Sequence, residues 1–155
     1  MNIRRAEIKD AERISQIICD TIRFINSKDY GPEQLKVWLD KNDISSTRDK
    51  LERGRTFFVL IENEKIVGVG ALDIEKNKLT GLYVDYKIQS KGIGSQLLEY
   101  IENYSREKGI KKLEMDSTIT AQSFYEKKNY KTLKEVNVEM DGIPITCVLM
   151  EKFLQ

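Results

Sequence analysis

The chain has 155 residues, which suits one ordinary domain, and we expect residues 1–155 to fold as a single domain. Its 26 basic and 25 acidic residues leave a formal net charge of +1, so no strong field points to a nucleic acid or an anionic membrane as a partner. It contains no histidine, which removes the commonest general base and the commonest metal ligand, and we expect no metal site.

The first third of the chain predicts a short strand followed by helices. Asn2 to Arg5 alternates in polarity as a short strand does. Pro32 suits the first position of a second helix, and a third short helix from Ser45 or Ser46 to Arg53 would end at Gly54. Before these, Asp10 would cap an amphipathic helix that carries isoleucines at helical spacing, at Ile14, Ile17, Ile18, Ile22 and Ile25.

The middle of the chain predicts antiparallel strands that lead into a helix. Two β-rich runs, Thr56 to Glu62 and Lys65 to Asp73, are joined by Asn63-Glu64 and read as a hairpin. Leu79 to Val84 would add a third antiparallel strand. Apolar residues then recur at helical spacing from Gly92 to Lys108, and Gly109 would end that helix.

The last third predicts a strand from Ile110 to Asp116, a helix from Thr118 or Thr120 to about Lys128, and a hairpin. The hairpin strands, Leu133 to Met140 and Ile143 to Phe153, flank Asp141-Gly142, a strong turn signal. The expected fold is therefore α/β (α+β), with a mixed, mostly antiparallel central sheet flanked by helices.

A glycine-bearing loop joins the third strand to the long helix. Gly92 and Gly94 remove side chains that would keep a ligand from the backbone, and glycine tolerates positive φ, so several N–H groups can point at one spot. That spot lies at a helix N-terminus, which suits a phosphate or pyrophosphate. A tight turn that uses glycine for geometry alone is the alternative.

Several short matches give the chain its resemblance to a known family. The loop Gln89-Ser90-Lys91-Gly92-Ile93-Gly94 fits the pattern Gln or Arg, two residues, Gly, one residue, Gly or Ala. Together with Leu82-Tyr83-Val84 before it, Phe124-Tyr125-Glu126-Lys127 on the last helix and the order of strands, it resembles the GCN5-related N-acetyltransferases (GNAT) over most of residues 2–153. The run from Asn26 to Leu35 resembles a branch of small bacterial members whose acceptors are mostly unassigned.

The resemblance implies that acetyl-CoA is a cosubstrate and that an acetyl group moves to a primary amine of a small molecule or peptide. It places the pyrophosphate on the loop amides and the pantetheine arm along the edge of the third strand. An exposed strand edge can pair with the amides of pantetheine, and a strand N–H can serve as an oxyanion donor. The implied contacts are Leu82, Tyr83, Val84, Gln89, Ser90, Lys91, Gly92, Ile93, Gly94 and Ser95.

Tyr125 resembles the family's tyrosine that protonates the departing thiolate. A phenol has a reference pKa of about 10 against about 8.5 for a thiol, so a positioned tyrosine can donate to the sulfur with only partial proton transfer. Tyr125 could instead be an aromatic core or rim residue. Thr118 stands where many members have an asparagine, so the cofactor contact of that asparagine is not carried over to this chain. Two other positions also differ from the family: Ser90 replaces a frequent glycine, and Asn129 replaces a glycine that is usual there.

The amine side is less defined by sequence. Tyr30 and Trp38 are candidate walls of the acceptor pocket. A core or helix-packing aromatic is the simpler interpretation of Trp38, whereas for Tyr30 the two interpretations are equally open. Without histidine, the amine proton must leave through a carboxylate, a tyrosine or water. Asp116 and Asp73 are the carboxylates to test first, but solvated strand-end charges are the simpler interpretation of both, and no base is assigned.

Two other functions fit parts of the pattern. A dinucleotide-binding oxidoreductase would use the glycine loop and Glu114 on the next strand, but its third glycine would fall at Leu97, and too little chain follows for a second nucleotide-binding half. A non-catalytic CoA-binding or interaction module on the same fold is the second alternative; Tyr125 and the intact loop argue against it.

The cellular compartment is predicted from the cysteine and hydropathy patterns. Cys19 and Cys147 stand far apart in no metal-binding or CxxC spacing, which favours a reducing environment. No stretch approaches a membrane-spanning length, and residues 1–7 carry no signal-peptide pattern, so we expect a cytoplasmic protein. Strands at the edge of the C-terminal hairpin could pair between chains in a homodimer.

Overall fold

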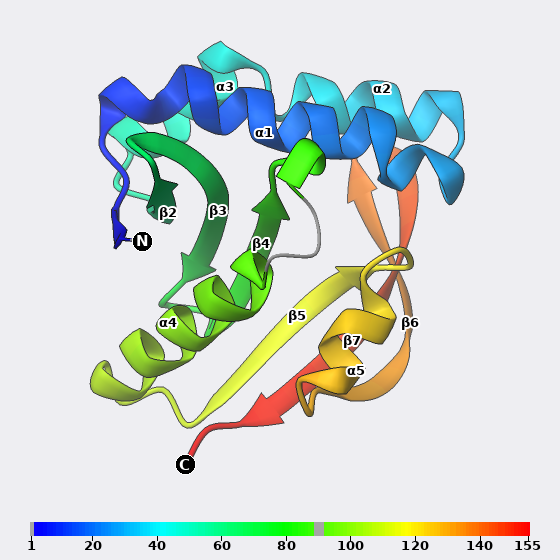
Figure 1. Cartoon of the computed structure of the whole chain (residues 1–155). Coiled ribbons are helices and arrows are strands. Elements are labelled where there is room, and N and C mark those ends of the chain that lie inside the picture. The colour runs from blue at the N-terminus through cyan, green and yellow to red at the C-terminus, as the bar shows by residue number, and fades with distance from the viewer. Residues whose placement is uncertain (1, 89–91) are drawn as a thin grey trace.

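The computed structural model describes residues 2–88 and 92–155, which form one seven-stranded sheet with helices on both faces (Figure 1). The strands are β1 (Asn2–Arg5), β2 (Thr56–Glu62), β3 (Lys65–Asp73), β4 (Lys78–Val84), β5 (Lys112–Thr118), β6 (Lys131–Met140) and β7 (Ile143–Phe153). The α-helices are α1 (Ala11–Phe24), α2 (Pro32–Asp40), α3 (Ile44–Glu52), α4 (Ile93–Glu107) and α5 (Gln122–Lys127), and three short 3-10 helices are η1 (Ile8–Asp10), η2 (Asn26–Lys28) and η3 (Tyr86–Ile88).

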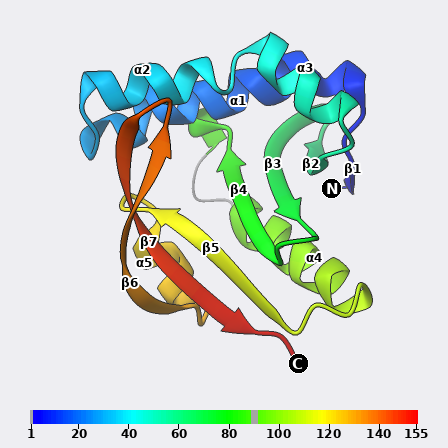
Figure 2. The same cartoon turned by 180° about the vertical axis from the view of Figure 1, so that it is seen from behind.

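The strands lie in the order β1-β2-β3-β4-β5-β7-β6. Every neighbouring pair is antiparallel except β4 and β5, which are parallel and share one described residue pair, Lys78 with Glu114. Beyond that pair the two strands diverge, as both views show (Figures 1 and 2). The structure therefore confirms the predicted mixed, mostly antiparallel sheet, and it opens a gap at the centre of that sheet.

Both faces of the sheet are covered, and β2 shows how one strand serves both. Phe58 and Leu60 belong to the apolar cluster that includes α4, whereas Phe57 and Val59 belong to the cluster that includes α1, α2 and α3. Successive side chains of a strand point to opposite faces, so a continuous apolar run is what a strand covered on both sides requires. The gap between β4 and β5 thus connects two covered faces.

Glycines in β3 bring α4 close to the sheet. A Cβ on Gly68 would lie 2.7 Å from Leu97 Cδ1, and a Cβ on Gly70 would overlap Ile101 Cδ1. Any larger residue would displace these side chains of α4, because packed interiors leave no room for an added methyl group. These two glycines therefore leave room for Leu97 and Ile101 between α4 and the sheet.

Most predicted elements are observed, with shifted ends. β5 begins two residues later than expected, and α5 begins at Gln122 because Thr118 Oγ1 accepts from the Ala121 N–H and holds a turn before the helix. Asn129 has φ +72°, the left-handed value expected of it. Asp10 precedes α1 but makes no capping bond to it; its carboxylate accepts from Arg4 and from the Glu7 N–H.

The C-terminal hairpin supplies one edge of the sheet. β6 is the outermost strand, whereas β7 lies between β5 and β6. None of the helices in the described part of the chain has the length and apolar character that a membrane span needs.

Candidate active site

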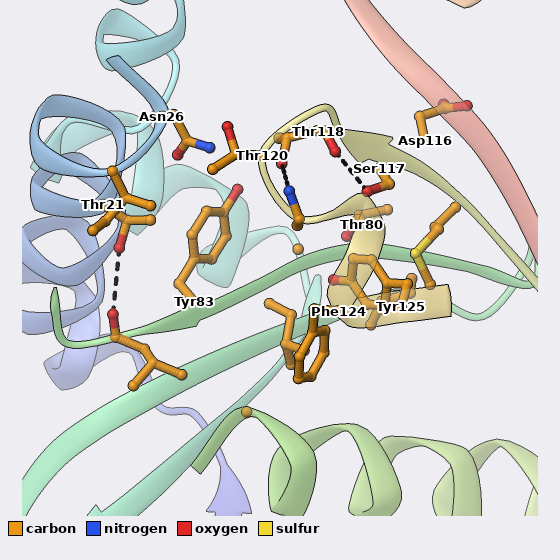
Figure 3. A pocket seen from close by; sticks show the side chains of 18 of the residues that line it. Thr21, Asn26, Thr80, Tyr83, Asp116, Ser117, Thr118, Thr120, Phe124 and Tyr125 are labelled. Carbon is orange, nitrogen blue, oxygen red and sulfur yellow. Dashed lines mark hydrogen bonds between the residues drawn. The ribbon is translucent and has the colours of Figure 1, made fainter. Parts of the chain in front are cut away.

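A cavity of about 600 Å³ lies where β4 and β5 diverge. One end is lined by β4, β5, α5 and the first turn of α4, and we name it the cofactor end. The other end is lined by the last part of α1, by residues that follow it and by α2, β6 and β7. We name it the amine end because Trp38, an expected wall of the acceptor pocket, lies there. Figure 3 shows side chains from both ends facing one cavity. Two ligands that approach from opposite faces of the sheet could therefore meet in the gap.

β4 forms one wall of this cavity, and its pairing with β3 is irregular. Ala71 pairs with Gly81 and Leu72 with Leu79, so Thr80 is left without a partner on β3 and makes a bulge. Leu82 and Val84, two of the expected cofactor contacts, line the cavity and pack toward α4, whereas Tyr83 packs toward α1 and α2. The backbone of β4 thus faces the gap with side chains turned to both ends.

The first turn of α4 lies at the cofactor end. Gly92 adopts φ +73°, a left-handed conformation in which a Cβ would meet no atom of the described residues within 4 Å. Gly92, Ile93, Gly94 and Ser95 all line the cavity, and the first turn of the helix contains no acidic residue. Among the described residues, no side chain caps this helix. N–H groups in a first turn have no acceptor within their helix, so this end attracts an anion.

Three of the expected cofactor contacts, Gln89, Ser90 and Lys91, lie outside the described residues. Their roles therefore stay predictions from the loop pattern.

Tyr125 lies on α5 at the cavity wall with 6% of its surface exposed. Its ring makes edge contacts with Phe124 and Tyr130, at centroid distances of 5.2 and 5.7 Å, and the Tyr130 hydroxyl in turn donates to Glu102 Oε2 at 2.8 Å. No described hydrogen bond uses the Tyr125 hydroxyl, which is directed into the cavity (Figure 3). Burial raises the pKa of Tyr125, and the neighbouring Tyr83 adds to the shift, so the phenol stays protonated.

Trp38 and Tyr83 line the cavity on the side of α2. Burial raises the pKa of Tyr83 to about 12, with a polar contact from Trp38 acting in the opposite direction. Gly81 leaves room for the Tyr83 ring, because a Cβ there would lie 2.6 Å from it. The Tyr83 hydroxyl is therefore a neutral hydrogen-bonding group in the cavity.

Tyr30, the other expected wall of the acceptor pocket, is buried but is not among the described residues that line the cavity. Its hydroxyl donates to the Thr146 carbonyl at 2.7 Å and accepts from the Ile119 N–H at 3.0 Å. Burial raises its pKa to about 12, so it remains a donor at neutral pH. Tyr30 links the segment after α1 to β7 and to the β5–α5 loop, beside Trp38, whose ring it meets edge-on at 5.4 Å.

The two carboxylates considered as bases have different surroundings. Asp116 lines the cavity and pairs with Lys78 at 3.2 Å. Asp73 accepts from the Lys76 N–H in the β3–β4 turn and is not among the described lining residues. Among residues 2–88 and 92–155, no cluster of three or more His, Cys, Asp or Glu side chains could hold a metal ion.

Sequence reasoning did not single out Asn26 as a site residue. It begins η2, is 4% exposed and lines the cavity, yet its Oδ1 atom has no hydrogen-bond partner among the described atoms. A polar residue after a helix reads in sequence as an ordinary loop residue. Only the tertiary fold reveals that it is buried, so no sequence signal could have found it.

Comparison with known proteins agrees with the fold. The family model for the acetyltransferase (GNAT) domain matches residues 26–153. The chain is 25% identical over 142 residues to the uncharacterized N-acetyltransferase YafP of Escherichia coli (strain K12), covering 92% of this chain and 89% of YafP.

Two solved structures share the fold. A GCN5-related N-acetyltransferase from Rhodopseudomonas palustris superposes with a TM-score of 0.90 at 21% identity, covering 99% of this chain and 95% of that one. The PaiA N-acetyltransferase of Thermoplasma acidophilum, solved with coenzyme A, gives a TM-score of 0.81 at 22% identity, with 98% of each chain covered. The diverging strands and the matched domain lead to one conclusion: the chain belongs to the GNAT acetyltransferase family.

Proposed function

We propose that the chain transfers an acetyl group from acetyl-CoA to a primary amine of a small molecule or peptide, by direct attack of the amine on the thioester. The observation that carries this proposal is the cavity between the diverging strands β4 and β5, which is lined by the first turn of α4 and by Tyr125. Family membership supports acetyl transfer, and the coenzyme A bound to the PaiA relative supports the cosubstrate.

The cofactor end would bind acetyl-CoA mainly through backbone groups. The N–H groups of Gly92, Ile93, Gly94 and Ser95 would hold the pyrophosphate, and the loop residues Gln89, Ser90 and Lys91 complete the proposed cradle. The edge of β4 at Leu82, Tyr83 and Val84 would pair with the amides of pantetheine. A strand N–H there would also donate to the carbonyl oxygen as negative charge develops on it.

Tyr125 is the proposed general acid. The amine nitrogen bonds to the acetyl carbon, the carbon–sulfur bond breaks, and the Tyr125 hydroxyl gives its proton to the departing sulfur. The proton released by the amine leaves through water or a carboxylate and finally restores Tyr125. Its raised pKa suits this role, because the phenol is protonated at neutral pH and transfers the proton only as the thiolate forms.

Two alternatives are weaker. A dinucleotide-binding oxidoreductase needs a glycine at position 97, where α4 has a fully buried leucine. A non-catalytic CoA-binding module would keep the cofactor end but would have no reason to leave the Tyr125 hydroxyl directed into the cavity without a protein partner.

Calorimetry and a thiol assay test the proposal together. We expect acetyl-CoA and CoA to bind, NAD not to bind, and free thiol to be released when a suitable amine is added. Tight NAD binding without any response to CoA would overturn the acetyltransferase proposal. CoA binding without thiol release for any amine in a broad panel would favour the non-catalytic module.

We also propose a cytoplasmic setting and leave a homodimer as a further proposal. Cys19 and Cys147 are both buried and unpaired, which suits a reducing compartment. β6 offers a free sheet edge, although its exposed Lys and Glu side chains are typical of strands that avoid pairing. Sedimentation equilibrium at micromolar concentration would separate a monomer from a dimer.

A further inference from the structure

One acidic side chain, Glu102, lies on the buried face of α4. It follows Leu98 by one helical turn, and only 6% of its surface is exposed. A carboxylate in such a place is costly unless a cation and hydrogen bonds compensate it. Both are present: Lys152 on β7 donates to the two carboxylate oxygens at 3.0 and 3.1 Å, and the Tyr130 hydroxyl donates to Oε2 at 2.8 Å. We name these three residues (Glu102, Tyr130 and Lys152) the Glu102 cluster.

The Glu102 cluster holds the ring of Tyr130 from several sides. The hydroxyl is fixed by Glu102, the Lys152 ammonium lies over the ring at 5.4 Å from its centroid, and one edge meets the ring of Tyr125 at 5.7 Å. Burial raises the pKa of Tyr130, and the charge of Glu102 raises it further, so the phenol stays protonated and remains a donor. Tyr130 therefore has little freedom to move behind Tyr125.

The end of α5 brings the two tyrosines together. The Tyr125 carbonyl accepts from the Lys128 N–H at 2.9 Å and from the Tyr130 N–H at 3.0 Å, and the Asn129 N–H donates to the Glu126 carbonyl. With Asn129 in the left-handed conformation, this is the Schellman pattern of a helix end. In that pattern the residue after the left-handed position packs against the residue five earlier, which here places Tyr130 against Tyr125.

The Tyr125 hydroxyl depends on this support because it has no hydrogen-bond partner among the described residues. It is directed into the cavity (Figure 3), and its direction is set by the ring, which rests on Phe124 and Tyr130. A general acid must lie within about 3 Å of the atom that it protonates. A displacement of about 1 Å can lower the rate by about a hundredfold, so a catalytic side chain needs neighbours that lock its position.

We propose that Tyr130 and Glu102 are positioning residues for the general acid, and that together they keep the Tyr125 hydroxyl directed at the departing sulfur. This inference rests on the proposed acetyltransferase activity and on the role proposed there for Tyr125. Neither positioning residue is among the described residues that line the cavity, so both act through Tyr125. Lys152 neutralises Glu102, so the cluster places no unpaired charge behind the phenol.

Tyr130→Phe tests the inference with the smallest change, because it keeps the ring and leaves the ion pair of Glu102 and Lys152 in place. The assay uses the most active amine of a panel of spermidine, phenethylamine, glutamate, kanamycin and a peptide with an N-terminal alanine. We expect kcat to fall about tenfold, with KM for acetyl-CoA and for the amine unchanged. The lost hydrogen bond should lower Tm by about 2–8 °C.

Tyr104→Phe is the matched control on α4. The ring of Tyr104 meets Phe58 edge-on at 4.9 Å and has the Lys108 ammonium 5.4 Å from its centroid, so its surroundings resemble those of Tyr130. Tyr104 is not among the described residues that line the cavity. We expect its substitution to leave kcat unchanged.

A double-mutant cycle separates positioning from a general effect on the fold. Tyr125→Phe keeps the ring but removes the hydroxyl that the cluster would position. Adding Tyr130→Phe to it should change kcat by less than about twofold, against about tenfold when Tyr125 is intact. A general structural effect would lower kcat by the same factor in both backgrounds.

Glu102→Gln separates positioning from stability. Glutamine still offers an oxygen to the Tyr130 hydroxyl but leaves Lys152 without its anion, so we expect a larger loss of Tm than in Tyr130→Phe, with kcat within about twofold of the wild type. The cycle with Tyr130→Phe does not depend on whether Glu102→Gln folds.

The outcomes distinguish this inference from the function on which it rests. An unchanged kcat in Tyr130→Phe, or an equal fall in both backgrounds, would overturn the inference and leave acetyl transfer intact. Normal turnover by Tyr125→Phe would overturn the role of Tyr125 and this inference together. No thiol release with any amine of the panel would overturn the proposed function and what rests on it.

Discussion

The two ends of the cavity use different parts of the chain. At the cofactor end the groups proposed to contact the cosubstrate belong to the backbone, namely the first turn of α4 and the irregular strand β4. At the amine end the lining consists of side chains, apolar ones such as Trp38 and Met140 together with polar ones such as Asn26 and Tyr83. Recognition at the cofactor end therefore depends on the conformation of the backbone, and recognition at the amine end depends on the identity of the side chains.

This difference determines which amino-acid substitutions each end of the cavity can tolerate. Backbone recognition constrains only a few positions, chiefly those where glycine permits a left-handed turn or a close approach. Side-chain recognition can change with every substitution on α1, α2, β6 or β7 without disturbing the cofactor end. A fold that keeps one cosubstrate while its acceptors change is expected to bind the two through separate regions, as here.

Tyr125→Phe acts where the two ends meet and has the largest expected effect. We expect kcat to fall by about a hundredfold, because a positioned acid contributes at least that much, with the affinity for acetyl-CoA nearly unchanged. Tm should change little, because no described hydrogen bond uses this hydroxyl. Stopped assays on the best amine and calorimetry with acetyl-CoA give both values. Normal turnover would reduce Tyr125 to a packing residue.

Gly92→Val should damage the cofactor end alone. The branched side chain would project into the open space beside the first turn of α4, and we expect the affinity for CoA to fall by at least about tenfold. Gly54→Val is a matched control, since Gly54 has φ +83° and equally open surroundings far along the chain. Both substitutions impose the same backbone strain, about 1–2 kcal/mol. The difference in CoA affinity between the two variants therefore reports on the ligand contact alone.

An unchanged CoA affinity in Gly92→Val would contradict the pyrophosphate cradle. Equal losses of affinity in both variants would point to general destabilisation instead. Circular dichroism on each variant confirms that it is folded before the affinities are compared.

The same division explains what the sequence could predict. The glycine spacing, Asp141-Gly142 and the alternating runs are local signals, and they gave the order of elements, the sheet class and the position of the loop. The gap between β4 and β5 was not predictable from residues, because it follows from pairing between strands far apart in the chain. Tyr30 and Asn26 show the limit most clearly. Both follow α1, yet only the fold makes one a link to β7 and the other a cavity residue.

Tyr30→Phe probes the support of the amine end. It removes a donor to the Thr146 carbonyl and an acceptor for the Ile119 N–H, so we expect a loss of about 1–2 kcal/mol of stability. For a chain of this size that corresponds to a Tm lower by about 2–8 °C. KM for the amine should rise a few-fold while KM for acetyl-CoA stays constant. Tyr100→Phe, on an exposed ring of α4, is the control and should change neither.

If Tyr30 were instead a direct wall of the pocket, its loss of a hydroxyl would alter amine selectivity without lowering Tm. A thermal melt and a comparison of two amines therefore distinguish support from contact.

Asp10→Asn has the smallest expected effect and should leave both ends unchanged, because Asp10 lies at the opposite end of α1 from Thr21. Burial alone would raise the pKa of the Asp10 carboxyl, but the Arg4 guanidinium and the Glu7 N–H together hold it below its usual value. A carboxyl with a lowered pKa in the folded state stabilises the protein above its unfolded pKa, about 3.9, and loses that contribution as the pH falls through the folded value.

The wild type should therefore be more stable than Asp10→Asn by about 1 kcal/mol at pH 7, a value kept small because Arg4 is partly exposed. The difference should shrink as the pH falls below about 4, once the wild-type carboxyl is protonated and both proteins carry an uncharged group at this position. Urea titrations at pH 7, 4 and 2.5 measure it. A difference that persisted unchanged at pH 2.5 would show that packing, and not the charge of Asp10, is responsible. A change in the KM for the amine or for acetyl-CoA at pH 7 would show that substrate binding in the cavity depends on the first turn of α1. It would contradict the expectation that Asp10 affects only stability.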